Sequence, residues 1–289
     1  MKHTDLIQDT AERKMAVENC LMFVRTGSVM YGTNIPGKSD NDFMGVFMPT
    51  ESHLLGLNSV EQVEFSTKNS SVRAKNTKDD VDCTLYSLPK YVRLLLNNNP
   101  NTLESLFIPE NCKLYVNPIM EELLNSRDIF VSKKLYHSFR GYSHSQMERL
   151  KRGEKNDSGR QELIQKFGYD TKMGSHVLRL YLECNELLST GTVTLPLKEN
   201  QMVLTVKKGE WEKEKFLEEC ERLEALCDEL YTKTTLKHSP DQEAANTLLV
   251  DMVKEYHGYE TDEGYVTFAY TVRQTIKRFF HRLGDKFDY

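Results

Sequence analysis

The stretch FVRTGSVMYGTNIPGKSDNDFMGVFM, Phe23–Met48, decides the fold class of this chain. The apolar run Cys20–Val24 leads into it and is short enough for a buried strand, and a second apolar strand begins at Asp42. Because alternate residues of a strand point to the same side, Asp40 and Asp42 would face one side together. Two adjacent carboxylates are costly to bury without a cation, and oxygen-only ligands favour magnesium or manganese. The stretch therefore predicts a metal site between two strands.

The Gly27-Ser28 pair follows the first of these strands. Glycine lets the backbone come close to a ligand. A helix or tight turn that starts after Ser28 would offer free N–H groups and a hydroxyl to an anion. A phosphate site beside a dicarboxylate metal site indicates phosphoryl or nucleotidyl transfer. The plainer alternative is an ordinary turn with solvated aspartates, but both features at this spacing favour the functional interpretation.

The same stretch resembles the signature of the DNA-polymerase-β-type nucleotidyltransferases, in which a Gly-Ser pair is followed after a gap by Asp-x-Asp. Within that superfamily it is most similar to the RNA-repair-pathway branch, RlaP, whose signature is roughly GS-x-x-YGT-x-x-P-x-SD-x-D-x-x-GV. Here one extra residue separates the proline from the serine. Further matches extend to about Asn246, so the resemblance covers most of the chain. The matching residues are Gly27, Ser28, Tyr31, Gly32, Thr33, Pro36, Ser39, Asp40, Asp42, Gly45 and Val46.

The expected fold class is α+β: a polymerase-β-like nucleotidyltransferase core with a short mixed sheet, followed by a helical domain. The 289 residues suffice for one large or two modest domains. The pattern becomes helical after Asn117, which places the core at residues 1–120 and a helical domain that closes the nucleotide cleft at 121–260. Residues 261–289 form a C-terminal extension whose role the sequence does not indicate.

A third acid is implied by the resemblance. In the family an aspartate precedes a Y-x-L-x-K pattern, which Tyr86, Leu88 and Lys90 match here. The resemblance thus points to Asp82 as a catalytic and metal-binding residue beside Asp40 and Asp42. Asp80 would face the same way on a strand, so the register leaves both open. The alternative is a solvated acidic turn.

Residues 169–179 resemble the family's YDTK-x-x-x-H-x-x-R helix. Lys172, His176 and Arg179 lie at helical spacing on one face. Three cation-capable groups arranged in this way are expected to hold a triphosphate from the side opposite Gly27 and Ser28. The alternative is a solvated or ion-paired helix face.

A second basic stripe precedes this helix. Lys133, His137, Arg140 and His144 recur at i, i+4, i+7 and i+11, and so would share one helix face. The functional interpretation is a contact surface for an RNA acceptor. A solvated helix face explains the same pattern, because charged stripes commonly face only water.

Other elements follow from local signals. An apolar helix is predicted at Leu88–Leu96, and Asn101 is expected to cap a short second helix. That second helix contains Glu104, within a tract that matches the family's NPN-x-x-E-x-LF; the glutamate is interpreted as structural or substrate-orienting, or else as solvated. Further predictions are strands at Gln62–Ser66, Thr192–Pro196 and Met202–Val206, and helices at Leu6–Asn19 and Glu212–Tyr231.

The composition bounds the function. Hydrophobic residues make up 39% and charged residues 28%, a soluble globular balance. No apolar run has the length of a membrane span, and the first residues contain no signal-peptide core. The six cysteines form no CxxC pair, which indicates reduced core residues in a cytoplasmic protein and argues against zinc. The net charge of −5 means that any nucleic-acid contact depends on a local basic patch.

The predicted function is metal-dependent transfer of a nucleoside monophosphate from a nucleoside triphosphate (NTP) to a hydroxyl, with Mg²⁺ or Mn²⁺. The resemblance implies an RNA 3′ end as acceptor and leaves room for a partner RNA ligase. One alternative is nucleotidylation of a protein (AMPylation) or of a small molecule. Another is non-catalytic binding of nucleotide or RNA, against which the intact Gly-Ser and Asp-x-Asp pairs count. The oligomeric state is not indicated.

Overall fold

The protein is represented by a computed structural model that describes residues 10–37, 39, 41–66, 81–151 and 161–258. Asp40 and Asp80 lie outside the described residues. So do the predicted extension at 261–289 and the first part of the predicted N-terminal helix.

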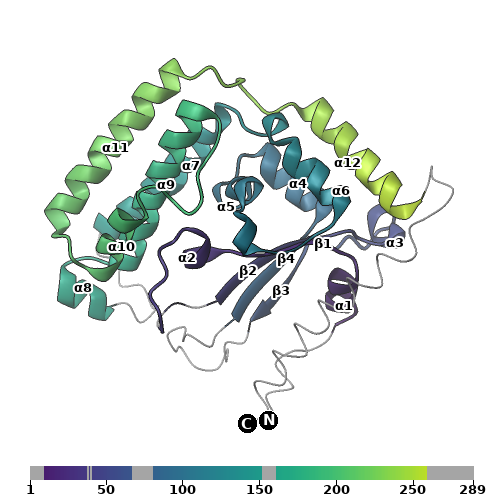
Figure 1. Cartoon of the computed structure of the whole chain (residues 1–289), viewed down its shortest axis with the longest axis horizontal. Coiled ribbons are helices and arrows are strands. Elements are labelled where there is room, and N and C mark those ends of the chain that lie inside the picture. Colours follow the sequence, from purple (N-terminus) through teal and green to yellow (C-terminus); the bar gives the residue numbers. More distant parts are fainter. Residues whose placement is uncertain (1–9, 38, 40, 67–80, 152–160, 259–289) are drawn as a thin grey trace, which may run out of the picture.

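A five-stranded sheet has the order β3-β4-β2-β1-β5 (Figure 1). The neighbours β2 and β4 run parallel, and every other neighbouring pair runs antiparallel. The sheet is therefore mixed, and the prediction of an α+β fold with a short mixed sheet is confirmed. The strands are β1 (Cys20–Arg25), β2 (Asn41–Phe47), β3 (Gln62–Ser66), β4 (Val81–Ser87) and β5 (Lys113–Val116).

The two faces of the sheet carry different cores. Along β2, Phe43 and Phe47 point to the side that helix α1 (Ala11–Glu18) covers, whereas Met44 and Val46 point to the side that the other helices cover. This alternation follows from the two-residue period of a strand. Figure 1 shows α1 below the sheet and α4, α5 and α6 above it. Both faces of β1 and of most of β2 are buried, whereas β4 buries only alternate residues.

Helices α7, α9 and α11 also lie above the sheet in Figure 1. Helix α9 packs against α7, α10 and α11, and this helical group stands beside α4, α5 and α6. The helices are α2 (Gly27–Met30), α3 (Glu51–Leu55), α4 (Leu88–Leu96), α5 (Pro100–Leu103), α6 (Pro118–Asn125), α7 (Lys134–Lys151), α8 (Gln161–Phe167), α9 (Thr171–Thr190), α10 (Asn200–Lys208), α11 (Lys213–Lys233) and α12 (Gln242–His257), with short 3₁₀ turns at Glu104–Phe107, Glu110–Cys112 and Arg127–Ile129.

The main hydrophobic core crosses the boundary that the sequence predicts at residue 120. It joins sheet residues such as Leu21 and Val46 to helical residues such as Leu178 and Leu223. Helix α12, which the sequence analysis did not predict, packs back on α4 and α6. The division into a core at 1–120 and a helical domain at 121–260 stays a prediction about independent folding.

The predicted strands at 192–196 and 202–206 are wrong. Residues 192–196 form no strand, and Met202–Val206 lies inside helix α10. Val203 and Val206 are buried at a spacing of three residues, which suits one helix face as well as a short strand. Gly209 ends the helix with a φ of 77°, a left-handed conformation that glycine adopts without strain.

The cap of the short helix α5 is Asn99 and not the predicted Asn101. The Asn99 side chain accepts from the Thr102 backbone N–H, and Pro100 occupies the first helical turn. Proline favours that turn because its missing N–H needs no partner there. The predicted strand Gln62–Ser66 and helix Leu88–Leu96 are confirmed with their boundaries.

All six cysteines lie within the described residues, and each is buried and free of disulfide bonds, as their apolar surroundings in the sequence led us to expect. Within the same described residues, no helix combines the length and the apolar character that a membrane crossing requires.

The hydrogen bonds of Asn98 connect α4 to the segment before α7, and replacing Asn98 tests how much this connection stabilises the fold. It is fully buried with a φ of 47°, its amide donates to the carbonyls of Leu95 and Phe130, and its Oδ1 accepts from the Ser132 hydroxyl. Asn98→Ala should lower the free energy of unfolding by about 2–4 kcal/mol, because a buried carbonyl and hydroxyl lose their partner. Urea denaturation measures this loss. The exposed Asn125→Ala should change stability by no more than about 0.5 kcal/mol, and equal losses in both variants would contradict the assignment.

Candidate active site

The Gly27-Ser28 turn is built against Asp42. Helix α2 begins at Gly27 directly after β1, and the Thr26 backbone N–H donates to the Asp42 carbonyl at 2.9 Å. Gly27 has a φ of 64°, and a Cβ placed on it would lie 2.2 Å from Asp42 Oδ2. Both the left-handed backbone and this close approach require glycine. The carboxylate of Asp42 therefore occupies the space that a side chain at residue 27 would fill.

Ser28 presents an unsatisfied hydroxyl. Its Oγ is buried and has no hydrogen-bond partner among the described residues. A buried hydroxyl without a partner costs free energy unless a ligand satisfies it. The first N–H groups of a helix also lack partners within the helix. The turn thus offers donors to an anion, as the sequence predicts.

Asp42 and Asp82 lie opposite each other on the parallel strands β2 and β4. Asp42 shares its strand face with Met44, and Asp82 shares its face with Thr84; Asp42, Met44 and Thr84 all line the same cavity. Ser66 donates a hydrogen bond to Asp82 Oδ1 at 2.6 Å. Neighbouring strands are about 4.8 Å apart, so one cation can bridge two such carboxylates.

The donor set fits a hard divalent cation. Carboxylate oxygens are the ligands that Mg²⁺ and Mn²⁺ prefer, and the absence of a side chain at Gly27 lets the Asp42 carboxylate lie against the turn. Among the described residues no group of three or more acidic, histidine or cysteine side chains is arranged so that it could hold a metal ion. The third predicted ligand, Asp40, lies outside the described residues.

A cavity of about 500 Å³ opens between this turn, the sheet and the helices α7, α9 and α10. It brings together the residues that the sequence predicts for nucleotide binding and one of the predicted metal ligands. Asp82 is not among its lining residues. The predicted residues that line it are Gly27, Ser28, Asp42, Lys172, His176 and Arg179.

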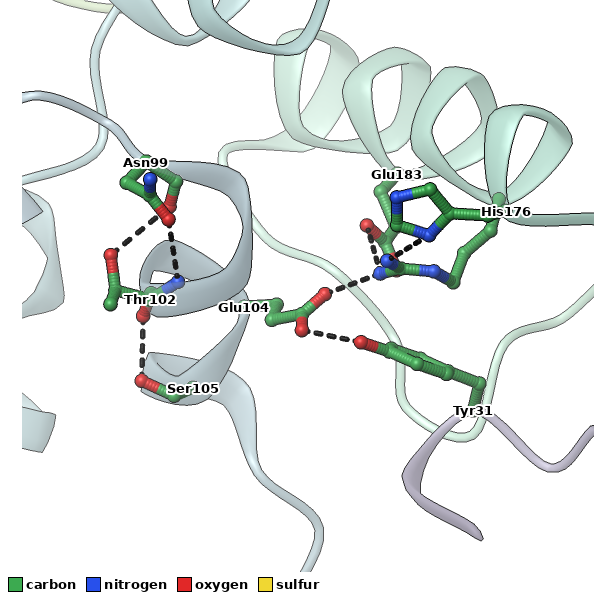
Figure 2. Close-up of polar contacts among 8 residues, drawn as sticks. Tyr31, Asn99, Thr102, Glu104, Ser105, His176 and Glu183 are labelled. Carbon is green, nitrogen blue, oxygen red and sulfur yellow. Dashed lines mark hydrogen bonds and ion pairs between the residues drawn. The ribbon is translucent and has the colours of Figure 1, made fainter. Parts of the chain in front are cut away.

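A buried polar network joins helix α9, which lines this cavity, to the end of the Gly27-Ser28 turn (Figure 2). Arg179 Nη1 donates to Glu104 at 2.6 Å and to Glu183 at 2.9 Å. The Tyr31 hydroxyl donates to the other oxygen of Glu104, and the Arg179 guanidinium stacks over the Tyr31 ring at 4.0 Å. Arg179 Nη2 lies 2.9 Å from His176 Nδ1. Side chains from α2, from the turn after α5 and from α9 thus meet at one guanidinium.

The network contains one positive charge and two carboxylates, all shielded from solvent. Burial raises the pKa of Glu183 to about 8 and also raises the pKa of Glu104, although the Arg179 charge opposes both shifts. Burial likewise raises the pKa of Tyr31, so its hydroxyl stays a donor. Arg179 balances only one charge, so burial of a second carboxylate raises the pKa of the Glu104–Glu183 pair.

As the alternative to triphosphate binding, the sequence analysis gave a solvated or ion-paired helix face. Arg179 is ion-paired: it is only 4% exposed and is bonded to two carboxylates. Lys172 is exposed and His176 half-buried, and both line the cavity. The sequence analysis interpreted Glu104 either as structural or substrate-orienting, or as solvated. Because it is buried and bonded to Arg179, the solvated interpretation is wrong. The nucleotide-binding roles of Lys172, His176 and Arg179 stay predictions.

The predicted RNA stripe lies elsewhere: His137, Arg140 and His144 are on α7, whereas Lys133 lies in the turn before this helix and so does not continue the predicted helix face. None of Lys133, His137, Arg140 and His144 lines the cavity. Arg140 forms ion pairs with Glu224 and Asp228 of α11, and His137 contacts the Tyr231 ring. These pairs partly neutralise Arg140. The contact of this stripe with RNA stays a prediction.

Three cavity residues escaped the sequence analysis. Tyr142 and Gln146 lie one turn apart on α7, and Lys207 ends α10, where its ammonium donates to the Thr33 carbonyl at 2.9 Å. No motif marks them, because they reach the cavity only through the packing of α7 and α10 against α9. The spacing of residues 142 and 146 was the one available signal.

The mixed sheet, the Gly-Ser turn and the aspartates beside it define a polymerase-β-like nucleotidyltransferase. The chain belongs to the RlaP family, the RNA repair pathway DNA polymerase beta family, whose model matches residues 5–251. The resemblance stated from the motifs is confirmed by this match.

Two further likenesses were found. The chain is 40% identical over 83 residues to a protein of Enterobacteria phage T4 described as "Uncharacterized 38.9 kDa protein in nrdC-mobD intergenic region", a match that spans 29% of this chain and 24% of that protein. A nucleotidyltransferase-like protein from Exiguobacterium sibiricum 255-15, known from a crystal structure, aligns with 10% identity and a TM-score of 0.27, over 97% of this chain and 88% of that one. A TM-score this low says nothing about shared architecture, so the family match carries the assignment.

Gly27 generates a stability prediction with a built-in control. Gly37 has a φ of 74° like that of Gly27, but a Cβ on it would meet no atom within 4 Å. Gly37→Ala should therefore cost only the left-handed strain of about 1–2 kcal/mol. Gly27→Ala should cost more, because the Asp42 carboxylate must also move. Urea denaturation of both variants compares these costs, and an equal loss would show that residue 27 does not contact Asp42.

The network generates a pH prediction. An acid with a higher pKa in the folded chain than in the unfolded chain binds more protons when folded, so its contribution to the free energy of unfolding falls as pH rises between about 4.5 and 8. Glu183→Gln should remove this fall, and the stability of the variant relative to the wild type should rise from pH 5 to about pH 8. Urea denaturation across that range measures it. Glu210→Gln, at an exposed site, should leave the wild-type profile unchanged; the same behaviour from Glu183→Gln would contradict the assignment.

Proposed function

We propose that the protein transfers a nucleoside monophosphate from an NTP to a hydroxyl group. The acceptor oxygen forms a bond to the α-phosphorus, the bond from that phosphorus to the bridging oxygen breaks, and pyrophosphate leaves. The acceptor hydroxyl gives up its proton to solvent. The observation that carries the proposal is the Gly27-Ser28 turn packed against Asp42 at the mouth of a cavity with cationic side chains, in a chain of this family.

Each part of the cavity has a role in this reaction. The free hydroxyl of Ser28 would donate to a phosphate oxygen. Lys172 and His176 of α9 face the same space and would balance the charge of the phosphates. Arg179 would act mainly by holding His176 in place, because its own charge is directed to Glu104 and Glu183.

Asp42 and Asp82, with Asp40, would hold Mg²⁺ or Mn²⁺. A bound divalent cation supplies two effects: it lowers the pKa of the attacking hydroxyl and it stabilises the charge on the leaving oxygen. Polymerase-β-like nucleotidyltransferases generally use divalent metals. The two described carboxylates fit this demand because they are paired across β2 and β4.

We favour an RNA 3′ end as acceptor, on the strength of the family's description as part of an RNA repair pathway. The net charge of −5 requires that RNA contact be local. The stripe of Lys133, His137, Arg140 and His144 is the proposed contact, although Arg140 would have to exchange its acidic partners for phosphates. A partner RNA ligase and a cytoplasmic location belong to the same proposal.

An assay with each labelled NTP, Mg²⁺ and RNA tests the proposal. Label should enter RNA that ends in a free 3′ hydroxyl and should not enter RNA whose 3′ end is blocked. Label that resists ribonuclease and stays with protein would replace the RNA acceptor by AMPylation. Nucleotide binding without any transfer would leave only a binding function.

Loss of either described carboxylate should abolish transfer. Asp42→Asn and Asp82→Asn should each reduce the rate by about 100-fold or more, since an amide cannot balance the metal charge. Both variants should keep the wild-type melting temperature within a few degrees. The exposed Asp251→Asn on α12 serves as the matched control and should retain full activity. Wild-type rates in Asp42→Asn would show that the metal site lies elsewhere.

A further inference from the structure

One wall of the cavity carries no charge. Tyr142 and Gln146 of α7 and Asn101 of α5 line it, and all three are uncharged. Tyr142 is 38% exposed, and no other large aromatic side chain among the described residues is as exposed. Within the described part of the chain, neither the Tyr142 hydroxyl nor the Gln146 amide makes a hydrogen bond. This wall therefore offers an aromatic ring and an unused amide to a ligand.

The Tyr142 ring is held in a defined orientation. It meets the His176 ring edge-to-face, with centroids 5.4 Å apart and planes at 89°. An edge-to-face contact covers at most one face of Tyr142, and the exposed fraction shows that the ring is not enclosed. His176 is itself bonded to Arg179 of the buried network. The ring is thus oriented before any ligand arrives.

Charge is distributed unevenly around the cavity. Helix α9 packs between α7 and α10. The cationic side chains Lys172 and Lys207 come from α9 and α10, and Lys207 also bonds to the segment that follows Ser28. The lining residues that come from α7 and α5, Tyr142, Gln146 and Asn101, are neutral. A ligand with an anionic end and a neutral, planar, hydrogen-bonding end matches this arrangement.

We propose that Tyr142 and Gln146 form the nucleobase subsite of the donor NTP. Tyr142 stacks on the base, and the Gln146 amide, one helical turn away, bonds to the base edge through its donor and its acceptor. The phosphates then lie toward Ser28, Lys172 and Lys207. This inference rests on the proposed function and assigns the part of the same cavity that discriminates among NTPs.

Direct binding measurements separate the two ends of the ligand. Calorimetric titration with ATP, GTP, CTP and UTP, in the presence of Mg²⁺, gives Kd for each nucleotide, and titration with inorganic triphosphate reports the phosphate end alone. Tyr142→Ala should weaken binding of the NTPs by about 10- to 100-fold, the usual size of a base-stacking contact. It should leave binding of inorganic triphosphate unchanged. Tyr142→Phe keeps the ring and should bind NTPs nearly as well as the wild type.

Gln146 is tested by selectivity. Gln146→Ala should reduce the preference of the wild type for its best base by about 5- to 20-fold, because a base edge loses its partners. Gln201→Ala, an exposed glutamine on α10 that does not line the cavity, is the matched control and should keep the wild-type preference. Lys172→Ala should weaken NTPs and inorganic triphosphate alike.

The outcomes distinguish this inference from the proposed function. If the wild type binds NTPs but Tyr142→Ala binds them equally well, the nucleobase subsite lies elsewhere and the proposed function is untouched. If Tyr142→Ala weakens inorganic triphosphate as much as NTPs, its role is structural and the inference is overturned. A wild type that binds no NTP overturns both. If Tyr142→Ala keeps the wild-type affinity for NTPs but binds an RNA 3′ end more weakly, Tyr142 contacts the acceptor. That result would also overturn the inference.

Discussion

The ion pair between Arg179 and its two carboxylates is the interaction on which the arrangement of the site depends. Glu104 belongs to the turn after α5, Glu183 to α9, and Tyr31 to the end of the helix that begins at Gly27. Breaking such a buried pair by removing one partner leaves an uncompensated charge and is strongly destabilising. The network therefore ties the Gly27-Ser28 turn to helix α9. It also fixes the histidine against which Tyr142 packs.

Features set by neighbouring residues could be predicted from the sequence. The strand at Gln62–Ser66 and the helix at Leu88–Leu96 follow from short apolar runs bounded by polar or turn residues. The Gly27-Ser28 turn and the carboxylate at Asp42 follow from the types and order of residues in one short segment. Such local signals survive because the tertiary structure agrees with them. The metal and nucleotide roles derived from them stay predictions.

Features set by distant contacts could not be predicted. The five residues Met202–Val206 fit a strand or a helix equally, and only packing against α9 decides for the helix. The partner of Arg179, Glu104, is 75 positions away in the chain, so a helical spacing gave no reason to pair them. Tyr142 and Gln146 likewise reach the cavity only because α7 lies beside it. Residue patterns show which faces are polar, but not what those faces meet.

The last described helix contacts the residue between α1 and β1. The Tyr256 hydroxyl donates to the Asn19 side chain across 237 positions, and α12 covers parts of α4 and α6. During synthesis on the ribosome the sheet and these helices emerge long before α12 does. Their apolar surfaces therefore stay uncovered until the ribosome has made α12. The nascent chain passes through a stage in which all strands of the described sheet have been made but the fold is still open, a stage at which chaperones commonly bind.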